Sequence, residues 1–171
     1  MKNKNILLAV CGSISFYKAY EILSLLKKNG ANVKVLLSDG VFKFATPVGF
    51  EALSDGVLTS FNESWTNGLD HISFSKNDLL IIAPASANSI NKIANGIADN
   101  IFLQTILAAS CPKIIAPAAN NNMLDNPATI RNLKILNDDG FTIIEPITKT
   151  LACGDYGKGA LNEPWLIVET A

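Results

Sequence analysis

Short apolar runs alternate with helix-length segments along most of this chain, and that alternation limits the possible folds more than any other feature. Residues 79–83 (Leu-Leu-Ile-Ile-Ala) are apolar at every position, as a strand must be when helices cover both faces of its sheet. Residues 6–10 form a similar run. Both runs fall far short of the roughly 20 apolar residues that cross a bilayer. They therefore predict buried strands and not membrane helices.

The same pattern predicts five main strands joined by helices. The expected strands are residues 6–10, 33–37, 79–83, 113–116 and 141–144, and the expected helices are about 19–30, 47–53, 88–94, 99–109 and 127–138. Residues 71–74 are expected to add a short extended piece, whereas the tail from Glu145 has no strong periodicity. Strands that alternate with helices indicate a parallel sheet, because parallel strands need crossover connections. We therefore expect a single domain over residues 1–171 with a doubly wound α/β fold, flavodoxin-like or Rossmann-like, and the strand order 2-1-3-4-5.

Charge and cysteine usage exclude several functions. The chain has 14 basic and 15 acidic side chains, so we expect it to bind neither nucleic acid nor a membrane surface. Cys11, Cys111 and Cys153 lie far apart without a C-x-x-C pair, which argues against disulfides and against a zinc site completed by His71. No metal is therefore expected, and reduced thiols favour a cytoplasmic location. Because only 17% of the residues are charged and 49% are hydrophobic, part of the surface is expected to face another subunit.

Doubly wound sheets bind ligands at the carboxyl ends of their strands, and small and polar residues follow three of the expected strands. Gly12 and Ser13 follow the first strand and lead into a helix, where Ser13 suits either a bound phosphate or an ordinary N-cap. The segment is neither a P-loop nor G-x-G-x-x-G, which disfavours nucleoside triphosphates and dinucleotides. Residues 84–89 follow the strand at 79–83 and would let a planar ligand approach closely. Asn120 follows the next strand and suits carboxylate recognition, although asparagines are also common in turns.

Two further residues are candidates for chemistry. His71 is the only histidine, and a lone histidine is more often a packed residue than a catalyst. Residues 151–159 contain three glycines, which suit a mobile flap, and Cys153 within them is a candidate acid or nucleophile. Cys11 and Cys111 are expected to be small buried hydrophobes. Serine hydrolysis is disfavoured because G-x-S-x-G is absent.

Four segments in order resemble motifs of one enzyme family. Residues 12–19 look like a first flavin loop, and Pro-Ala-Ser-Ala-Asn-Ser at 84–89 with residues 95–100 looks like a P-A-S-A-N-T helix entry. Residues 117–123 resemble P-x-M-N-x-x-M, and residues 152–157 resemble a substrate clamp. His71-Ile72 stands where the family has its active-site histidine. The chain thus resembles the homo-oligomeric flavin-containing cysteine decarboxylases over essentially its whole length.

The resemblance implies FMN as cofactor and, most closely, 4'-phosphopantothenoylcysteine of coenzyme A synthesis as substrate. It assigns catalytic roles to three residues: Asn120 holds the substrate carboxylate, His71 acts near the flavin, and Cys153 donates the final proton. FMN contacts are implied for Gly12, Ser13, Ile14, Ser38, Ser86, Ala87, Asn88, Ser89 and Ala119, and substrate contacts for Asn120, Ala152, Cys153 and Gly154. Sites shared between the subunits of a homotrimer, often assembled into dodecamers, are implied as well. So is a phosphopantothenate-cysteine ligase, either fused or separate.

The sequence also departs from the family motifs. Ala119 replaces a methionine, Leu124 replaces an aromatic residue, and Ala160-Leu161 replaces Arg-Met, which concerns packing around the flavin and substrate. Alternative functions on the same fold are a peptidyl-cysteine decarboxylase, a flavin prenyltransferase and a non-catalytic flavin-binding regulatory subunit. The glycine-rich clamp around Cys153 favours the coenzyme A reaction over the first of these, and His71 with Cys153 argues against the second.

Overall fold

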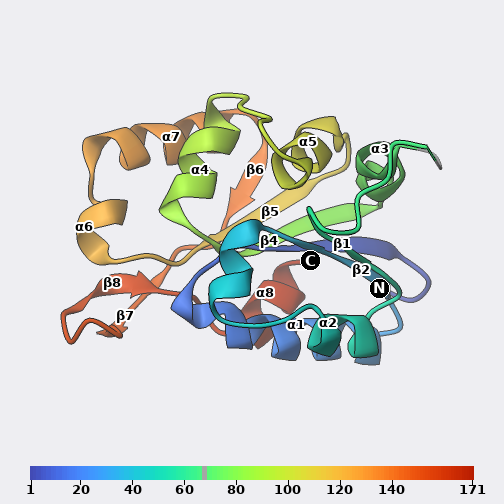
Figure 1. Cartoon of the computed structure of the whole chain (residues 1–171). Coiled ribbons are helices and arrows are strands. Elements are labelled where there is room, and N and C mark those ends of the chain that lie inside the picture. The colour runs from blue at the N-terminus through green and yellow to red at the C-terminus, as the bar shows by residue number, and fades with distance from the viewer. Residues whose placement is uncertain (67–68) are drawn as a thin grey trace.

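Six parallel strands form the centre of the protein, seen in a computed structural model that describes residues 1–66 and 69–171 (Figure 1). The strands are β1 (Asn5–Val10), β2 (Asn32–Leu37), β3 (Val57–Leu58), β4 (Leu79–Ala85), β5 (Lys113–Pro117) and β6 (Phe141–Ile143). Their order across the sheet is β3-β2-β1-β4-β5-β6. This confirms the doubly wound fold and the predicted order of the five main strands. The sequence did not predict β3, because a pair of residues is too short to show a period.

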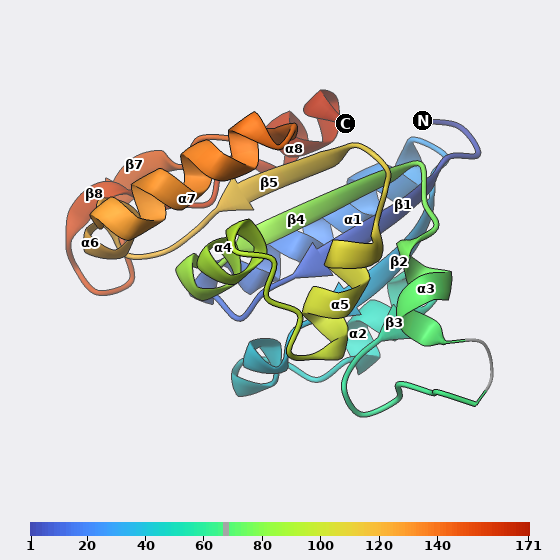
Figure 2. The same ribbon diagram turned by 90° about the horizontal axis from the view of Figure 1, so that it is seen from above.

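Helices cover both faces of this sheet (Figures 1 and 2). One face carries α1 (Lys18–Lys28), α2 (Val48–Leu53) and α8 (Pro164–Thr170). The other face carries α3 (Asp70–Ser75), α4 (Ala87–Ala94), α5 (Ile101–Ala108) and α7 (Pro127–Asp138). Short helices η1 (Ile14–Tyr17), η2 (Asp39–Lys43) and α6 (Asn121–Leu124) lie in the loops that follow β1, β2 and β5. Among the residues described, no helix is long and apolar enough to cross a membrane.

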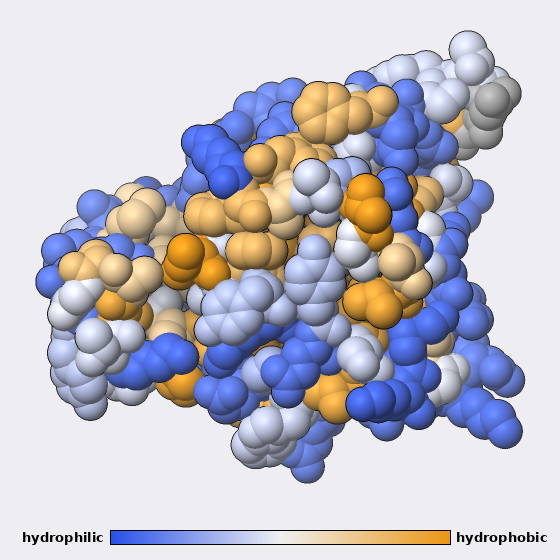
Figure 3. All heavy atoms as spheres, turned by 60° about the horizontal axis from the view of Figure 1, so that its bottom comes forward, coloured by the Kyte–Doolittle hydropathy of each residue, from blue (hydrophilic) through white to orange (hydrophobic). Residues whose placement is uncertain are grey.

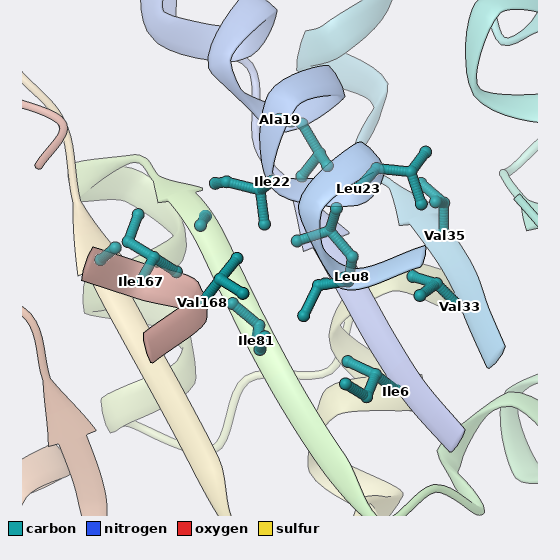
Figure 4. Packing of buried hydrophobic residues seen from close by; sticks show 14 of the residues in the cluster. Ile6, Leu8, Ala19, Ile22, Leu23, Val33, Val35, Ile81, Ile167 and Val168 are labelled. Atoms are coloured by element: carbon teal, nitrogen blue, oxygen red, sulfur yellow. The ribbon is translucent and has the colours of Figure 1, made fainter. Parts of the chain in front are cut away.

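The central strand β1 explains why the apolar runs are continuous. Ile6 and Leu8 point to the α1 side of the sheet and pack with Ile22, whereas Leu7 and Ala9 join the cluster under α4, α5 and α7 (Figure 4). All five side chains are at most 1% exposed. Burial of a leucine or isoleucine side chain contributes about 1.5–3 kcal/mol, so neither face of β1 tolerates a polar residue.

The segment around His71 was predicted wrongly. Residues 71–74 were expected to be extended, but Asp70–Ser75 form α3. Phe74 packs against the cluster on the α5 side of the sheet, and its ring lies under the Lys34 ammonium. Four residues that alternate in polarity fit either a strand or a single helical turn, and here contact with α5 selects the helix.

The tail after Glu145 is ordered by contacts that leave no period in the sequence. It forms the antiparallel hairpin of β7 (Ile147–Thr150) and β8 (Tyr156–Ala160), followed by α8. Lys18, only 8% exposed, donates to the carbonyl of Leu161 at 3.3 Å and to Oε1 of Glu163 at 3.2 Å. The start of α1 thereby fixes the point where the chain leaves the hairpin.

Asp55 connects three elements at the amino ends of the strands. Its carboxylate accepts hydrogen bonds from Nζ of Lys27 at 2.7 Å and from the backbone N–H of Val33 at 2.6 Å. Burial alone would raise the pKa of Asp55, but these two hydrogen bonds outweigh burial and hold the pKa below its ordinary value. The end of α1 is thereby joined to the start of β2 through the turn before β3.

We predict that Asp55→Asn lowers the free energy of unfolding at pH 7 by about 1 kcal/mol, because the ion pair is partly exposed. A lowered folded-state pKa stabilises the protein above the unfolded pKa of about 3.9, and the effect is lost as the pH falls through the folded value. Urea unfolding at pH 7 and at pH 3 measures the difference. Asp138→Asn is the control, because Asp138 pairs with Lys134 on the exposed side of the same helix, α7, and so joins no separate elements. An equal loss in both variants, or a loss that persists at pH 3, would contradict the prediction.

Candidate functional site

A cavity of about 760 Å³ lies at the carboxyl ends of the central strands, where the doubly wound fold predicts a ligand site. This volume lies within the roughly 300–1,000 Å³ range of small-molecule and cofactor pockets. Most residues expected at the site line it: Gly12, Ser13, Ile14, Ser38, Ser86, Ala87, Asn88, Ser89, Ala119, Asn120, Ala152 and Cys153. Gly154 and His71 are not among the described lining residues.

The loop after β1 is fixed by contacts with two other loops. Ser13 caps η1 by accepting from the N–H of Ser15 at 3.3 Å, and its hydroxyl donates to the carbonyl of Ala118 at 3.5 Å. The N–H of Gly12 donates to Oγ of Ser38 at 3.1 Å. A Cβ on Gly12 would lie 2.4 Å from the carbonyl carbon of Gly40, so only glycine lets these loops meet. Ser13 therefore is an N-cap and also lines the cavity.

The loop after β4 presents hydroxyl groups at the start of α4. Ser86 caps this helix by accepting from the N–H of Ser89 at 3.3 Å, and the two hydroxyls are 3.2 Å apart. Cys11 lies behind them and is fully buried, as expected of a small hydrophobe. Burial raises the pKa of the Cys11 thiol, and weaker hydrogen bonds from Ser89 and Ser86 oppose that rise. Cys11 thus stays neutral behind the loop that lines the cavity.

Asn120 and Cys153 meet at the mouth of the cavity although 33 residues separate them. Asn120 is the N-cap of α6, where its Oδ1 accepts from the N–H of Asn122 at 2.9 Å. The amide oxygen is therefore engaged, and Nδ2 points to Sγ of Cys153 at 3.3 Å and to Oδ2 of Asp155 at 3.3 Å. Sγ of Cys153 also lies 3.3 Å from Oδ2 of Asp155. The site thus presents an amide donor and a thiol side by side.

Glycines of β8 make this meeting possible. The N–H of Ala119 donates to the carbonyl of Gly159 at 3.1 Å, and a Cβ on Gly159 would lie 2.1 Å from the carbonyl oxygen of Ala119. A Cβ on Gly157 would lie 2.9 Å from Cγ of Asn121. Gly157 and Gly159 thus allow the hairpin to pack tightly against the loop after β5. Of the three glycines in residues 151–159, only Gly154 has a backbone in the left-handed region, with φ of +90°.

His71 is not among the described residues that line this cavity. His71 is half-buried on α3, with its ring 5.2 Å from the ring of Trp65. Asp70, the residue before His71, accepts from the backbone N–H of Ser64. The single chain therefore brings Asn120 and Cys153 together, but not His71.

Several residues of the site were not singled out from the sequence. The lining also includes Tyr17, Asp39, Gly40, Phe102, Leu103, Lys149 and Leu151. Asp39 and Lys149 are the charged side chains among the described lining residues, so the cavity is otherwise neutral. Asp155 belongs to the clamp motif of residues 152–157, which indicates that it lies near the substrate. The motif does not predict its contact with Asn120. No cluster of three or more potential metal ligands occurs within residues 1–66 and 69–171.

Comparisons with known proteins find relatives over nearly the whole length of this chain. The chain is 45% identical over 174 residues to the coenzyme A biosynthesis bifunctional protein CoaBC of Bacillus subtilis, which covers 100% of this chain but only 43% of that protein. It is 40% identical over 171 residues to a probable phosphopantothenoylcysteine decarboxylase of Streptococcus mutans, covering 97% of this chain and 96% of that protein. The chain thus spans less than half of the bifunctional relative and nearly all of the shorter one.

Solved structures share the fold over almost the whole chain. A Cys-to-Ser variant of a PPC decarboxylase, in complex with pantothenoylaminoethenethiol, has a TM-score of 0.86 and 34% identity, with 99% of this chain and 96% of that chain covered. The FMN-dependent cysteine decarboxylase SpaF has a TM-score of 0.83 and 29% identity, with 98% and 94% covered. The family model described as Flavoprotein matches residues 1–171. The chain therefore belongs to the Flavoprotein family, the family of flavin-containing cysteine decarboxylases that its motifs resemble.

Proposed function

We propose that this chain is an FMN-dependent decarboxylase that converts 4'-phosphopantothenoylcysteine to 4'-phosphopantetheine in the cytoplasm, as a step of coenzyme A synthesis. The observation that carries the proposal is the pair formed by Nδ2 of Asn120 and Sγ of Cys153, 3.3 Å apart at the mouth of the cavity. An amide donor suits the carboxylate that leaves, and a thiol suits the proton that must be returned. The Streptococcus mutans relative, a probable phosphopantothenoylcysteine decarboxylase, supports this reaction, and the Bacillus subtilis relative supports its place in coenzyme A synthesis.

The cavity residues fit FMN. Small side chains of Ala87, Ala118 and Ala119 leave room for a flat ring. Hydroxyls and free N–H groups of the turn at Ser13 and of the start of α4 suit a phosphate and a polyol chain. When bound, FMN accepts two electrons from the cysteine portion of the substrate and returns them after CO2 has left, so no net oxidation occurs.

Asn120 is the residue that holds the carboxylate. Because its Oδ1 accepts from the N–H of Asn122, the amide cannot flip, and Nδ2 stays directed at the clamp. Fixing the amide in advance avoids the cost of ordering it when the substrate binds. Loss of CO2 leaves a carbon that must take up a proton, and the adjacent exposed thiol of Cys153 supplies it.

His71 acts in this proposal at the cavity of a neighbouring subunit, in a homotrimer or a multiple of it. Within one chain, α3 lies on the opposite side of the molecule from the β7–β8 hairpin (Figure 2), and His71 does not line the described cavity, which supports this arrangement. Apolar side chains lie among polar ones on the α2 side of the surface (Figure 3). The large apolar residues that are at least 43% exposed include Ile14, Tyr17, Phe44 and Val48. Exposed apolar groups of this kind mark association sites. A phosphopantothenate-cysteine ligase, fused or separate, would supply the substrate.

The reaction is tested by incubating purified protein with 4'-phosphopantothenoylcysteine and following the mass of the product. We expect loss of CO2 alone, and we expect the released cofactor to run as FMN on HPLC. A turnover assay also separates the enzyme from a binding subunit without activity. An unchanged substrate mass after reconstitution with FMN, or FAD as the sole cofactor, would contradict the proposal.

Asn120→Asp should abolish the reaction before any CO2 is released. Aspartate still caps α6, so the fold is kept, but Nδ2 is replaced by a negative oxygen that repels the substrate carboxylate. We expect the rate of CO2 release to fall by at least about a hundredfold. Flavin bleaching under anaerobic conditions measures the preceding oxidation of the substrate, which should slow as well. Normal bleaching in this variant would show that Asn120 does not hold the carboxylate.

Cys153→Ser should fail at a later step. A serine hydroxyl is a much weaker acid than a thiol, so proton return slows while oxidation and decarboxylation continue. The variant should release CO2 and accumulate an enethiol that is lighter than 4'-phosphopantetheine by two hydrogens, as measured by mass spectrometry. Formation of 4'-phosphopantetheine at the normal rate would show that another group is the acid.

Mixing two inactive variants tests whether subunits share the site. If His71 acts in the neighbouring cavity, His71→Asn subunits and Asn120→Asp subunits, dissociated and reassembled together, should regain part of the activity that neither has alone. Light scattering on the mixture gives the assembly size. Failure to regain activity in a mixed trimer would show that His71 does not act in the cavity of a neighbouring subunit.

A further inference from the structure

Asp155 holds both groups that the proposed reaction uses. Its Oδ2 lies 3.3 Å from Nδ2 of Asn120 and 3.3 Å from Sγ of Cys153, which closes a triangle with the 3.3 Å contact between those two residues. The thiol donates to the carboxylate, and the amide donates to it as well. Since Oδ1 of Asn120 is engaged by Asn122, Nδ2 is the part of this amide that faces a ligand.

The backbone keeps this carboxylate in place. The carbonyl of Asp155 accepts from the N–H of Leu151 at 2.7 Å, and the carbonyl of Leu151 accepts from the N–H of Gly154 at 2.9 Å. These bonds form a tight turn at the tip of the β7–β8 hairpin. The hairpin itself is fixed against Ala119 by Gly159. Asp155 is exposed at the rim, and Lys149 and Asp39 are the charged residues among the described cavity lining.

The chemistry of this contact matches that of the substrate. Asn120 binds a carboxylate in the proposed function, and in this structure its Nδ2 already donates to a carboxylate. Two carboxylates cannot share one amide donor without strong repulsion, and within the described residues Asp155 makes no salt bridge that would offset its charge. The substrate carboxylate must therefore displace Asp155 from Asn120, and this displacement also frees the thiol of Cys153 from one of its two partners.

We propose that Asp155 is a positioning residue that occupies the carboxylate subsite of the free enzyme and competes with carboxylate ligands for Asn120. The inference rests on the proposed function, because it takes Asn120 as the carboxylate donor. It predicts that Asp155 weakens the binding of a ligand that carries the carboxylate and leaves its decarboxylated counterpart unaffected. A residue that only shaped the loop would change both affinities alike.

The test compares two ligands that cannot react, because oxygen replaces their sulfur. One is 4'-phosphopantothenoylserine, which keeps the carboxylate, and the other is the corresponding ethanolamine amide, which lacks it. Calorimetry on the FMN-loaded protein gives both dissociation constants. In Asp155→Asn, which keeps an acceptor for the Cys153 thiol but removes the charge, we expect the serine compound to bind about tenfold more tightly. The ethanolamine compound should bind within about twofold of the original protein.

Two controls identify the cause. Glu145→Gln removes one negative charge just before β7, where Glu145 pairs with Lys158 of β8 at 2.6 Å and is not among the described lining residues. It should leave the ratio of the two constants unchanged. In an Asn120→Ala background the Asp155→Asn gain should disappear, since the competition acts through Asn120. An unchanged or weaker affinity for the serine compound, or an equal gain for both ligands, would overturn the inference.

Failure of this inference can be distinguished from failure of the proposed function. Decarboxylation of 4'-phosphopantothenoylcysteine by the original protein is measured in the same preparation. If CO2 is released but the ratio does not change in Asp155→Asn, the role of Asp155 is wrong and the function stands. If no CO2 is released, the proposed function itself is wrong.

Discussion

Burial of both faces of the central parallel strands is the constraint on which the rest of this structure depends. Leu7 and Leu8 are adjacent in β1 and point to opposite helical layers, and both are fully buried. A sheet of this kind needs helices on each side and crossovers between its strands, so the loops at the carboxyl ends gather at one edge. The cavity lies at that edge, which explains why residues from the ends of β1, β2, β4 and β5 line one space.

The chemistry at the mouth depends on a second constraint, the close approach of β8 to the loop after β5. Gly159 lies so near the carbonyl of Ala119 that any side chain there would collide with backbone. This contact brings Cys153 of the hairpin to Asn120 of the α6 cap. Asn120 thus has a structural role and a chemical one, since the bond that caps the helix also orients the amide. A residue with both roles is best studied through aspartate, which keeps the cap and replaces the donor by a negatively charged oxygen.

The charge distribution fits a site that handles a carboxylate by hydrogen bonding. The walls are largely hydroxyl, amide and apolar groups, and Cys11 behind them is kept neutral by burial. A neutral wall leaves the small number of charges at the rim to decide which ligands bind. Asp155 is the rim charge in direct contact with Asn120 and Cys153, and so it has the largest influence on a ligand carboxylate.

The sequence alone determined the doubly wound fold, the order of the main strands and most of the residues around the cavity, because apolar period and strand ends are local properties. The cap of α7 at Asn126, directly before Pro127, is readable for the same reason. Tertiary structure alone decided that residues 70–75 are helical, that the tail forms a hairpin, and that the glycines of β8 serve close packing. These depend on contacts between distant segments, such as α3 with α5 and Gly159 with Ala119, which no local pattern encodes. The same reason explains the contact of Asp155 with Asn120 and the position of His71 away from the cavity of its own chain.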